Sequence, residues 1–271
     1  LGQIKELLKT DNVINMDSRT VISSISFGQV EQYKWEDAVR FTAVMDEAML
    51  LSALDISKSY IQLDQHISWI TDLKTKFELN VREIPLRSVS GWITDEHSIY
   101  HKDRKYFSVE AVNVEIENRE VVRWTQPIIV SAQEGIIGFI VKKINGVYHF
   151  LVQAKLEAGN FDILELSPTV QCITGNYRLG FNEYSVPFID HFLYPSPSSI
   201  LHSSMQSEEG GRFYREQNIN MIIEVGNEFD HTNIPSNFTW MTFAQLLEFI
   251  RFNNYLNIQA RSLISLIRFT K

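Results

Sequence analysis

The sequence predicts an α+β domain, in which a β-sheet from the middle of the chain is flanked by helices from both ends. Apolar residues recur at helical spacing in residues 1–77 and again after residue 243. Between these regions they alternate with polar residues, as in strands. Of the 271 residues, 44% are hydrophobic and 12% aromatic, which is ample for a buried core and argues against disorder.

The N-terminal part is predicted to form four helices. Apolar side chains fall on one face of residues 1–8 and of residues 35–54. A short helix is predicted over residues 21–25, with Asp17 or Ser18 as its N-cap. Residues 64–77 are predicted to form another helix that begins at Asp64.

The middle of the chain is predicted to form strands, of which one hairpin is the clearest. Asn145-Gly146 separates two apolar runs, residues 136–144 and 147–157, and this dipeptide is typical of a type I′ hairpin turn. On the second strand we expect one apolar face and one mixed face, since alternate side chains point to opposite sides. Further strands are predicted over residues 106–116 and 221–225, and closing helices over residues 243–252 and 260–267.

The chain contains an internal repeat. Residues 1–25 align without a gap on residues 243–267 at a constant offset of 242, with eight identities: Gln3/Gln245, Glu6/Glu248, Asn12/Asn254, Asn15/Asn257, Arg19/Arg261, Ile22/Ile264, Ser23/Ser265 and Ile25/Ile267. A period of this length indicates that the repeated unit is a whole domain. We therefore predict closing helices of a preceding copy in residues 1–26, a connecting segment with a long helix in 27–63, and a complete module in 64–271.

Charge and cysteine content narrow the class of partner and the compartment. A formal net charge of −8 argues against nucleic acid and against an anionic membrane as partner. Cys172 is the only cysteine, so a disulfide framework is excluded and a reducing compartment is expected. No apolar stretch approaches the roughly 20 residues that span a bilayer. We expect a cytoplasmic protein that does not enter a membrane.

Several blocks of the sequence together resemble the NDP-hexose 2,3-dehydratase family. The blocks are EIPLRSVSGW (83–92), YFSVEAV (106–112), REVVRWTQPII (119–129), GIIGFIVKKINGVYHFLVQAKLEAGN (135–160), LELSPTVQCITGNY (164–177) and NNYLNIQARSLI (253–264). The resemblance implies a Nudix-like fold, two tandem modules per chain and a homodimer. It also implies dTDP-4-keto-6-deoxy-glucose as the substrate, in deoxysugar biosynthesis.

The sequence departs from Nudix hydrolases in one respect. Their motif requires Gly, five residues, Glu, seven residues and then Arg-Glu. Counted back from Arg119-Glu120, the Glu position holds Ala111 and the Gly position holds Lys105. Metal-assisted diphosphate hydrolysis is therefore disfavoured as the function.

The implied reaction sets the chemistry that the site needs. A ketone at C4 acidifies the proton at C3, so elimination of the C2 hydroxyl needs a base, a donor for the enolate oxygen and an acid. No hydride moves, so we expect no cofactor, and the sequence has neither a Gly-x-Gly-x-x-Gly nor a Walker A motif.

Gln153, Lys155 and Glu157 are the candidate catalytic residues. Alternate residues of a strand project about 7 Å apart on one face, a span that suits a hexose ring. The alternative is a solvated sheet face with an ion pair. The resemblance favours catalysis, with Glu157 as base and Lys155 as acid or oxyanion donor, and the two roles could be exchanged.

Further polar and aromatic residues are candidates for substrate binding. Guanidinium groups suit the diphosphate, and adjacent glycines can bring backbone N–H groups close to an anion. Tryptophans can stack on thymine, and amides and hydroxyls can bind the sugar. The candidates are Trp92, Arg123, Trp124, Gln126, Asn160, Gln171, Asn176, Tyr177, Gly210, Gly211, Arg212 and Tyr214. For each, the alternative is a structural role in the core, in a turn or in a surface ion pair.

Two other groups are not assigned to the site. His97 and His101 lie four residues apart, but their segment is predicted as loop and strand, so we expect no metal site. Asn254, Asn257 and Arg261 occur in both copies of the repeat, which favours a structural role for them. Two functions stay open: a dehydratase, or a non-catalytic nucleotide-sugar-binding or scaffold module of a duplicated protein.

Overall fold

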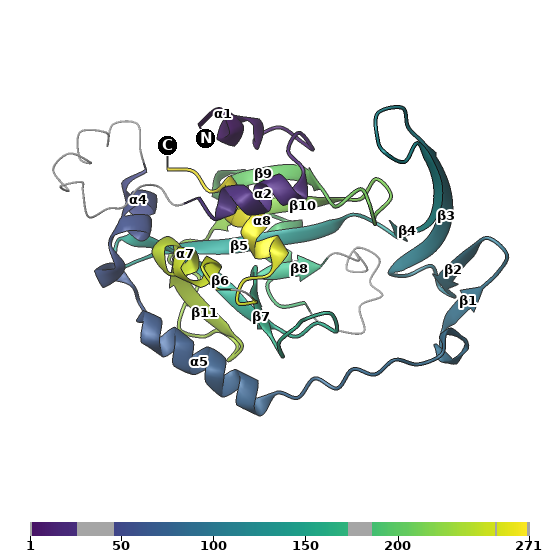
Figure 1. Ribbon diagram of the computed structural model, residues 1–271. Helices are drawn as coiled ribbons and strands as arrows, with labels where there is room; N and C mark the ends of the chain where they lie inside the picture. Colours follow the sequence, from purple (N-terminus) through teal and green to yellow (C-terminus); the bar gives the residue numbers. More distant parts are fainter. Residues whose placement is uncertain (1, 26–45, 173–185, 253, 270–271) are drawn as a thin grey trace.

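The computed structural model describes residues 2–25, 46–172, 186–252 and 254–269. Within them the predicted α+β class is confirmed, with helices at both ends of the chain and two β-sheets between them (Figure 1). None of the described helices is long and apolar enough to cross a bilayer.

The larger sheet has seven strands in the described residues and holds the core. Its main path is β11-β6-β5-β10-β9, while β7 pairs with β6 and β8 pairs with β5. All its pairs are antiparallel except β5 with β10, which is parallel. The strands are β5 (Gly135–Ile144), β6 (Val147–Lys155), β7 (Glu165–Ser167), β8 (Val170–Cys172), β9 (Ile200–Ser207), β10 (Gln217–Glu224) and β11 (Phe238–Thr242).

The smaller sheet is a four-stranded antiparallel meander that lies to one side of the larger sheet (Figure 1). The two sheets are joined where Ile129 exchanges backbone hydrogen bonds with Arg212 and Tyr214, at 2.9 and 2.8 Å. Its strands are β1 (Trp92–Thr94), β2 (Ser98–His101), β3 (Phe107–Glu115) and β4 (Arg123–Ser131).

The β5–β6 hairpin confirms the turn predicted from Asn145-Gly146. Both turn residues have positive φ angles, 53° and 78°, as a type I′ turn requires. Alternation along β6 is also confirmed. Tyr148, Phe150, Val152 and Ala154 belong to the core on one face, and Leu151 to the core on the other.

Helices cover the two faces of this sheet unequally. One face is packed by residues of α1, α2, α4, α5, α7 and α8 and their flanks, whereas the other is packed by α6 and by loop residues such as Phe188 and Phe229. The helices are α1 (Gly2–Leu7), α2 (Met16–Ser23), α4 (Glu47–Leu54), α5 (Leu63–Lys76), α6 (Asp190–Leu193), α7 (Phe243–Ile250) and α8 (Ile258–Leu266). Short 3₁₀ turns are η3 (Ile56–Lys58), η4 (Leu86–Ser88) and η6 (Pro197–Ser199).

Two predicted helix starts and the continuity of one predicted helix are wrong. The cap of α2 is Asn15, whose side chain accepts from the Ser18 N–H, and not Asp17 or Ser18. The cap of α5 is Gln62, whose backbone N–H donates to Gln65 Oε1 at 2.9 Å, so Asp64 lies in the first turn. The helix predicted over residues 35–54 does not run through Asp46, because Asp46 has an extended backbone and caps α4. Residues 35–45 lie outside the described residues.

Equivalent residues of the repeat have matching local geometry. Asn12 and Asn254 have φ angles of 57° and 61°. Asn15 caps α2 through the Ser18 N–H at 2.8 Å, and Asn257 caps α8 through the Ala260 N–H at 2.9 Å. The sequence repeat is therefore also a repeat of local structure.

The two equivalent helices α2 and α8 pack against each other (Figure 1). Arg19 of α2 is 1% exposed and donates to Ser262 Oγ at 2.7 Å and to the carbonyl oxygen of Ser207 at 2.8 Å. Its equivalent Arg261 is half-buried and donates to the carbonyl oxygen of Leu256 at 3.0 Å. Arg19 thus joins the N-terminal helices to the module.

Replacing Gly138 by alanine should destabilise the fold by about 1–3 kcal/mol, because the new methyl group overpacks the core. A Cβ at Gly138 would lie 2.0 Å from Cε1 of Phe192, whose ring is buried. Urea denaturation measures the loss. Gly159→Ala is the control, since its Cβ would meet nothing within 4 Å, and an equal loss in both variants would contradict this packing.

Arg19→Met should destabilise the protein by about 3 kcal/mol or more, because it removes a buried, hydrogen-bonded charge and leaves its partners unpaired. Arg261→Met, the equivalent change one repeat later, should cost about 1 kcal/mol. Thermal unfolding of both variants tests this. Equal losses would mean that Arg19 does not join α2 to α8.

Candidate functional site

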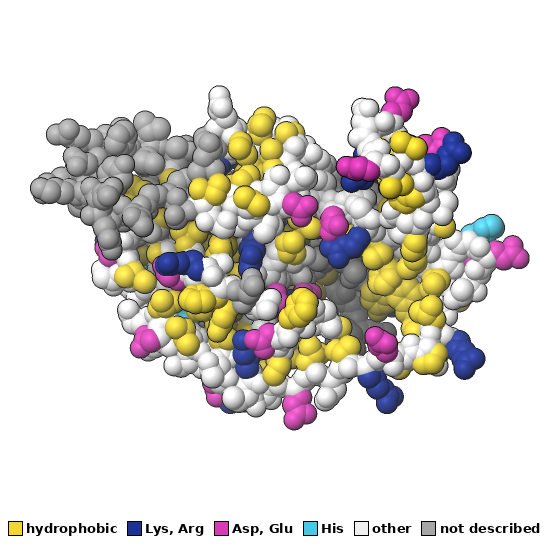
Figure 2. Space-filling view, viewed as in Figure 1, with side chains coloured by type: hydrophobic (Ala, Val, Ile, Leu, Met, Phe, Trp, Pro, Cys, Tyr) yellow, Lys and Arg dark blue, Asp and Glu magenta, His cyan; other side chains and the backbone are white. Residues whose placement is uncertain are grey.

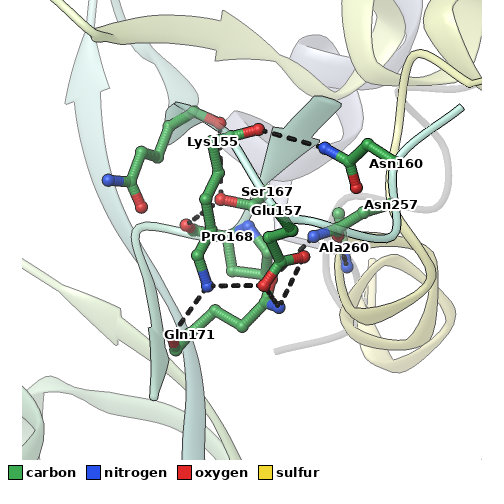
Figure 3. A network of polar contacts seen from close by, with 9 residues as sticks. Lys155, Glu157, Asn160, Ser167, Pro168, Gln171, Asn257 and Ala260 are labelled. Carbon is green, nitrogen blue, oxygen red and sulfur yellow. Dashed lines mark hydrogen bonds and ion pairs between the residues drawn. The ribbon is translucent and has the colours of Figure 1, made fainter. Parts of the chain in front are cut away.

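Three of the predicted residues form one polar network at the ends of β6 and β8 (Figure 3). Lys155 Nζ lies 3.1 Å from Glu157 Oε1. Gln171 Nε2 donates to the same carboxylate oxygen at 3.1 Å. Lys155 Nζ also donates to the main-chain oxygen of Gln171 at 3.1 Å. An ammonium group and a carboxylate are thus held together by one glutamine.

The network is buried on one side and open on the other. The side chains of Lys155 and Glu157 are 24% and 39% exposed, so a ligand can reach them. Gln171 and Asn257 behind them are only 8% and 5% exposed. Asn257 donates from Nδ2 to Gln171 Oε1 at 2.6 Å, which links the start of α8 to the network.

The prediction of a single strand row of three residues is wrong in one detail. Strand β6 ends at Lys155, and Glu157 begins a turn, in which its carbonyl oxygen accepts from the Asn160 N–H at 3.1 Å. Gln153 lies two residues earlier on β6, paired with Ser167 of β7. Asn160 donates from Nδ2 to the main-chain oxygen of Lys155 at 3.4 Å. The ion pair is therefore formed between a strand end and the turn that follows it.

Glu165 of β7 adds a second carboxylate to this region. Burial raises the pKa of Glu165, the negative charge of Glu157 raises it further, and Arg261 and Lys74 act in the opposite direction. Lys74 also pairs with Asp162 and lowers the pKa of that carboxyl group. Two carboxylates, Glu157 and Glu165, therefore lie close to Lys155.

The substrate-binding candidates around β4 form a separate group. Trp124 Nε1 donates to Gln126 Oε1 at 2.7 Å, and Gln126 Nε2 donates to the carbonyl oxygen of Gly211 at 2.8 Å. The glycine pair Gly210 and Gly211 lies in the turn before β10, so these residues meet between β4 and that turn. Arg212 pairs with Glu209 in the same turn, Tyr214 donates its backbone N–H to Ile129, and Arg123 pairs with Glu115 at 3.1 Å.

Trp92 lies on the smaller sheet, in an aromatic cluster. Its ring centroid is 4.8 Å from that of Phe107 and 5.9 Å from that of His101. It lines a cavity of about 330 Å³ whose other walls are mainly apolar, including Leu86, Val89 and Ile99. Hydrophobic side chains gather on this part of the surface in Figure 2. The remaining candidates, Asn176 and Tyr177, lie outside the described residues.

The segment around His97 and His101 forms β1 and β2 with a turn between them, as predicted. Within residues 2–25, 46–172, 186–252 and 254–269, no three side chains of His, Cys, Asp or Glu are grouped so as to hold a metal ion.

Two residues in or near the network were not predicted as site residues. Asn257 was assigned a structural role from the repeat, and it does cap α8, but its amide also contacts Gln171. Glu165 lies in one of the blocks that resemble the dehydratase family, but its position in the sequence did not mark it as a site residue. Both reach the site through tertiary contacts, for which the sequence gives no local signal.

Comparison with known proteins identifies the family. The sequence model of the NDP-hexose 2,3-dehydratase family matches residues 63–267. The chain belongs to this family. The resemblance predicted from the sequence blocks is thereby confirmed, and the match contains the whole Lys155–Glu157–Gln171–Asn257 network.

Three curated relatives cover nearly all of this chain. Each is named a dTDP-4-dehydro-6-deoxy-alpha-D-glucopyranose 2,3-dehydratase. The one from Saccharopolyspora spinosa is 40% identical over 269 residues, 98% of this chain and 54% of the relative. Those from Amycolatopsis orientalis and Streptomyces violaceoruber are 36% and 35% identical, over 98% and 97% of this chain and 51% and 55% of the relatives. The chain thus spans about half the length of the curated relatives it matches.

Glu165→Gln should raise the melting temperature at pH 7. The pKa of Glu165 is raised in the folded protein, so its ionisation opposes folding. Below its ordinary pKa of 4.5, Glu165 is protonated in the folded and the unfolded protein and does not lower the free energy of unfolding. As the pH rises through the raised pKa of the folded protein, Glu165 ionises and the free energy of unfolding falls. The gain should therefore shrink as the pH falls to about 4, and thermal unfolding between pH 4 and pH 8 measures it.

The control for this prediction is Glu248→Gln, which removes a surface ion pair with Arg251 and should change little. A gain in the Glu165 variant that does not depend on pH would show that charge is not its cause.

Proposed function

We propose that the protein is a dTDP-4-keto-6-deoxy-glucose 2,3-dehydratase, acting in deoxysugar biosynthesis. The observation that carries the proposal is the accessible Lys155–Glu157 pair, held by Gln171 inside the segment that matches the dehydratase family. The names of the three relatives support the substrate.

In the proposed reaction Glu157 removes the proton from C3, which is acidified by the ketone at C4. The electron pair of the broken C–H bond passes into the enolate, whose O4 is stabilised by the Lys155 ammonium group. The C2–C3 double bond then forms as the C2–O bond breaks. The leaving hydroxyl takes a proton from Lys155 and departs as water, so atoms and electrons balance without a redox cofactor. The roles of the two side chains could be exchanged.

The remaining parts of the substrate are assigned to the other candidates. We propose that Arg123 and Arg212, with the Gly210-Gly211 turn and Tyr214, bind the diphosphate. Trp92 and Trp124 are proposed to contact the thymine. Asn160, Gln153, Asn176 and Tyr177 are assigned to the sugar or the nucleotide, whereas the amides of Gln126 and Gln171 are engaged with protein partners.

We also propose that the protein is duplicated. Residues 64–271 form one complete Nudix-like module, residues 1–26 are closing helices of a preceding module, and residues 27–63 connect them. The matching caps and backbone angles of the repeat support this division. A homodimer follows from the family resemblance. The net charge of −8 argues against nucleic acid as a partner, and the single cysteine favours a cytoplasmic protein.

A second function is a nucleotide-sugar-binding or scaffold module without catalysis. The observation that favours it is the length of the relatives, since this chain spans about half of each. In a duplicated enzyme the chemistry can reside in one module alone.

Turnover of dTDP-4-keto-6-deoxy-glucose in D₂O by the full-length protein tests the proposal. Wild-type protein should release water from the sugar. The resulting C2–C3 enol, which keeps its hydroxyl at C3, should then take up deuterium from the solvent at C2. Glu157→Gln and Lys155→Ala should each lower kcat by about 100-fold or more, because a general base or acid is lost.

Matched controls come from a second Lys–Glu pair, in which Lys143 of β5 lies 3.1 Å from Glu224 at the end of β10. Lys143→Ala and Glu224→Gln should leave turnover within about threefold of wild type, because this pair lies at the turn end of the hairpin and not at the Lys155 end of β6. Normal turnover by both the Glu157 and Lys155 variants would reject this site as catalytic. Unchanged dTDP binding in those variants would then favour the scaffold function.

A further inference from the structure

Asn257 uses its side chain for two purposes at the start of α8 (Figure 3). Its Oδ1 accepts from the Ala260 N–H at 2.9 Å, which caps the helix. Its Nδ2 donates to Gln171 Oε1 at 2.6 Å. Because one oxygen and one nitrogen of the same amide are both used, the side chain is fixed in one orientation.

The contact with Asn257 decides which end of the Gln171 amide faces Glu157. With Oε1 held by Asn257, Nε2 points at the carboxylate and lies 3.1 and 3.4 Å from its two oxygens. The opposite orientation would place a carbonyl oxygen against a carboxylate, which is unfavourable. Gln171 and Asn257 are 8% and 5% exposed, so little water competes for these hydrogen bonds.

Gln171 also fixes the other member of the ion pair, since its main-chain oxygen accepts from Lys155 Nζ at 3.1 Å. Residues from β6, β8 and α8 therefore meet in one chain of contacts, from the helix cap to the accessible carboxylate. Asn257 is the least exposed of Lys155, Glu157, Gln171 and Asn257.

We propose that Asn257 is a positioning residue, which orients the Gln171 amide and through it the Glu157 carboxylate for proton transfer. The effect on catalysis rests on the proposed function of Glu157. The orientation of the Gln171 amide does not depend on that proposed function, and it can be measured without turnover.

The repeat provides a matched control. Asn15 occupies the same position in the preceding copy and caps α2 through the Ser18 N–H at 2.8 Å. Its side chain is exposed, and in the described part of the chain its only hydrogen bond is that cap. The same substitution at Asn15 therefore changes a cap alone, whereas at Asn257 it changes a cap and the contact with Gln171.

The experiment compares Asn257→Asp and Asn257→Ser with Asn15→Asp and Asn15→Ser in the full-length protein. Asp and Ser both cap helices well, so melting temperatures should stay within about 4 °C of wild type. Neither can hold Gln171 as Asn257 does: the carboxylate has no N–H to donate, and the serine side chain is shorter.

Both Asn257 variants should lower kcat by about 10- to 100-fold with KM within about threefold, since a reacting group is misplaced while substrate binding is kept. Both Asn15 variants should leave kcat and KM unchanged. A kcat within twofold of wild type in folded Asn257 variants would overturn the proposal. So would an equal loss in the Asn15 variants.

The activity-independent readout is the pair of ¹H–¹⁵N signals from the Gln171 side-chain amide, assigned by their loss in Gln171→Glu. They should shift in the Asn257 variants and stay in place in the Asn15 variants. If they move only in the Asn257 variants while Glu157→Gln remains active, Asn257 orients Gln171 but the chemistry lies elsewhere. If they do not move in Asn257→Ser, the inference is wrong whatever the activity.

Discussion

Burial of the β5–β6 hairpin on both faces is the constraint on which the rest of the structure depends. Phe139, Val141 and Phe150 face the helices on one side, and Ile140 and Leu151 face the second core on the other. Such a hairpin needs cover on two sides, which one layer of helices cannot give. The far end of β6 is where this cover stops, and there the polar residues Lys155 and Glu157 become accessible.

The fold could be predicted where one local signal dominated. Asn145-Gly146 admits few backbone conformations, so the turn and the alternation that follows from it were predicted correctly. Helix starts were predicted less well, because several capping residues stand close together in the sequence. Asn15, Asp17 and Ser18 are all residue types that cap helices well, and the structure uses Asn15.

The site was predictable only in part, because it combines residues that are close in sequence with residues that only the fold brings together. The proximity of Lys155 and Glu157 follows from their spacing, although the strand ends before Glu157. Asn257 and Glu165 are far from them in sequence or belong to another strand, and only the fold brings them near. A sequence pattern can place residues along one element, but it cannot say which helix end will meet that element.

The packing of α2 on α8 also bears on how the protein is made. Arg19 and its partner Ser262 are 243 positions apart, so this contact joins segments that leave the ribosome at very different times. During synthesis the apolar face of α2, with Met16 and Ile22, has no α8 to cover it. Contacts of such long range form slowly, because a large loop must close first. The residues of α2 thus depend for their burial on a helix that is synthesised 243 positions later, and in the interval they are a natural binding segment for chaperones.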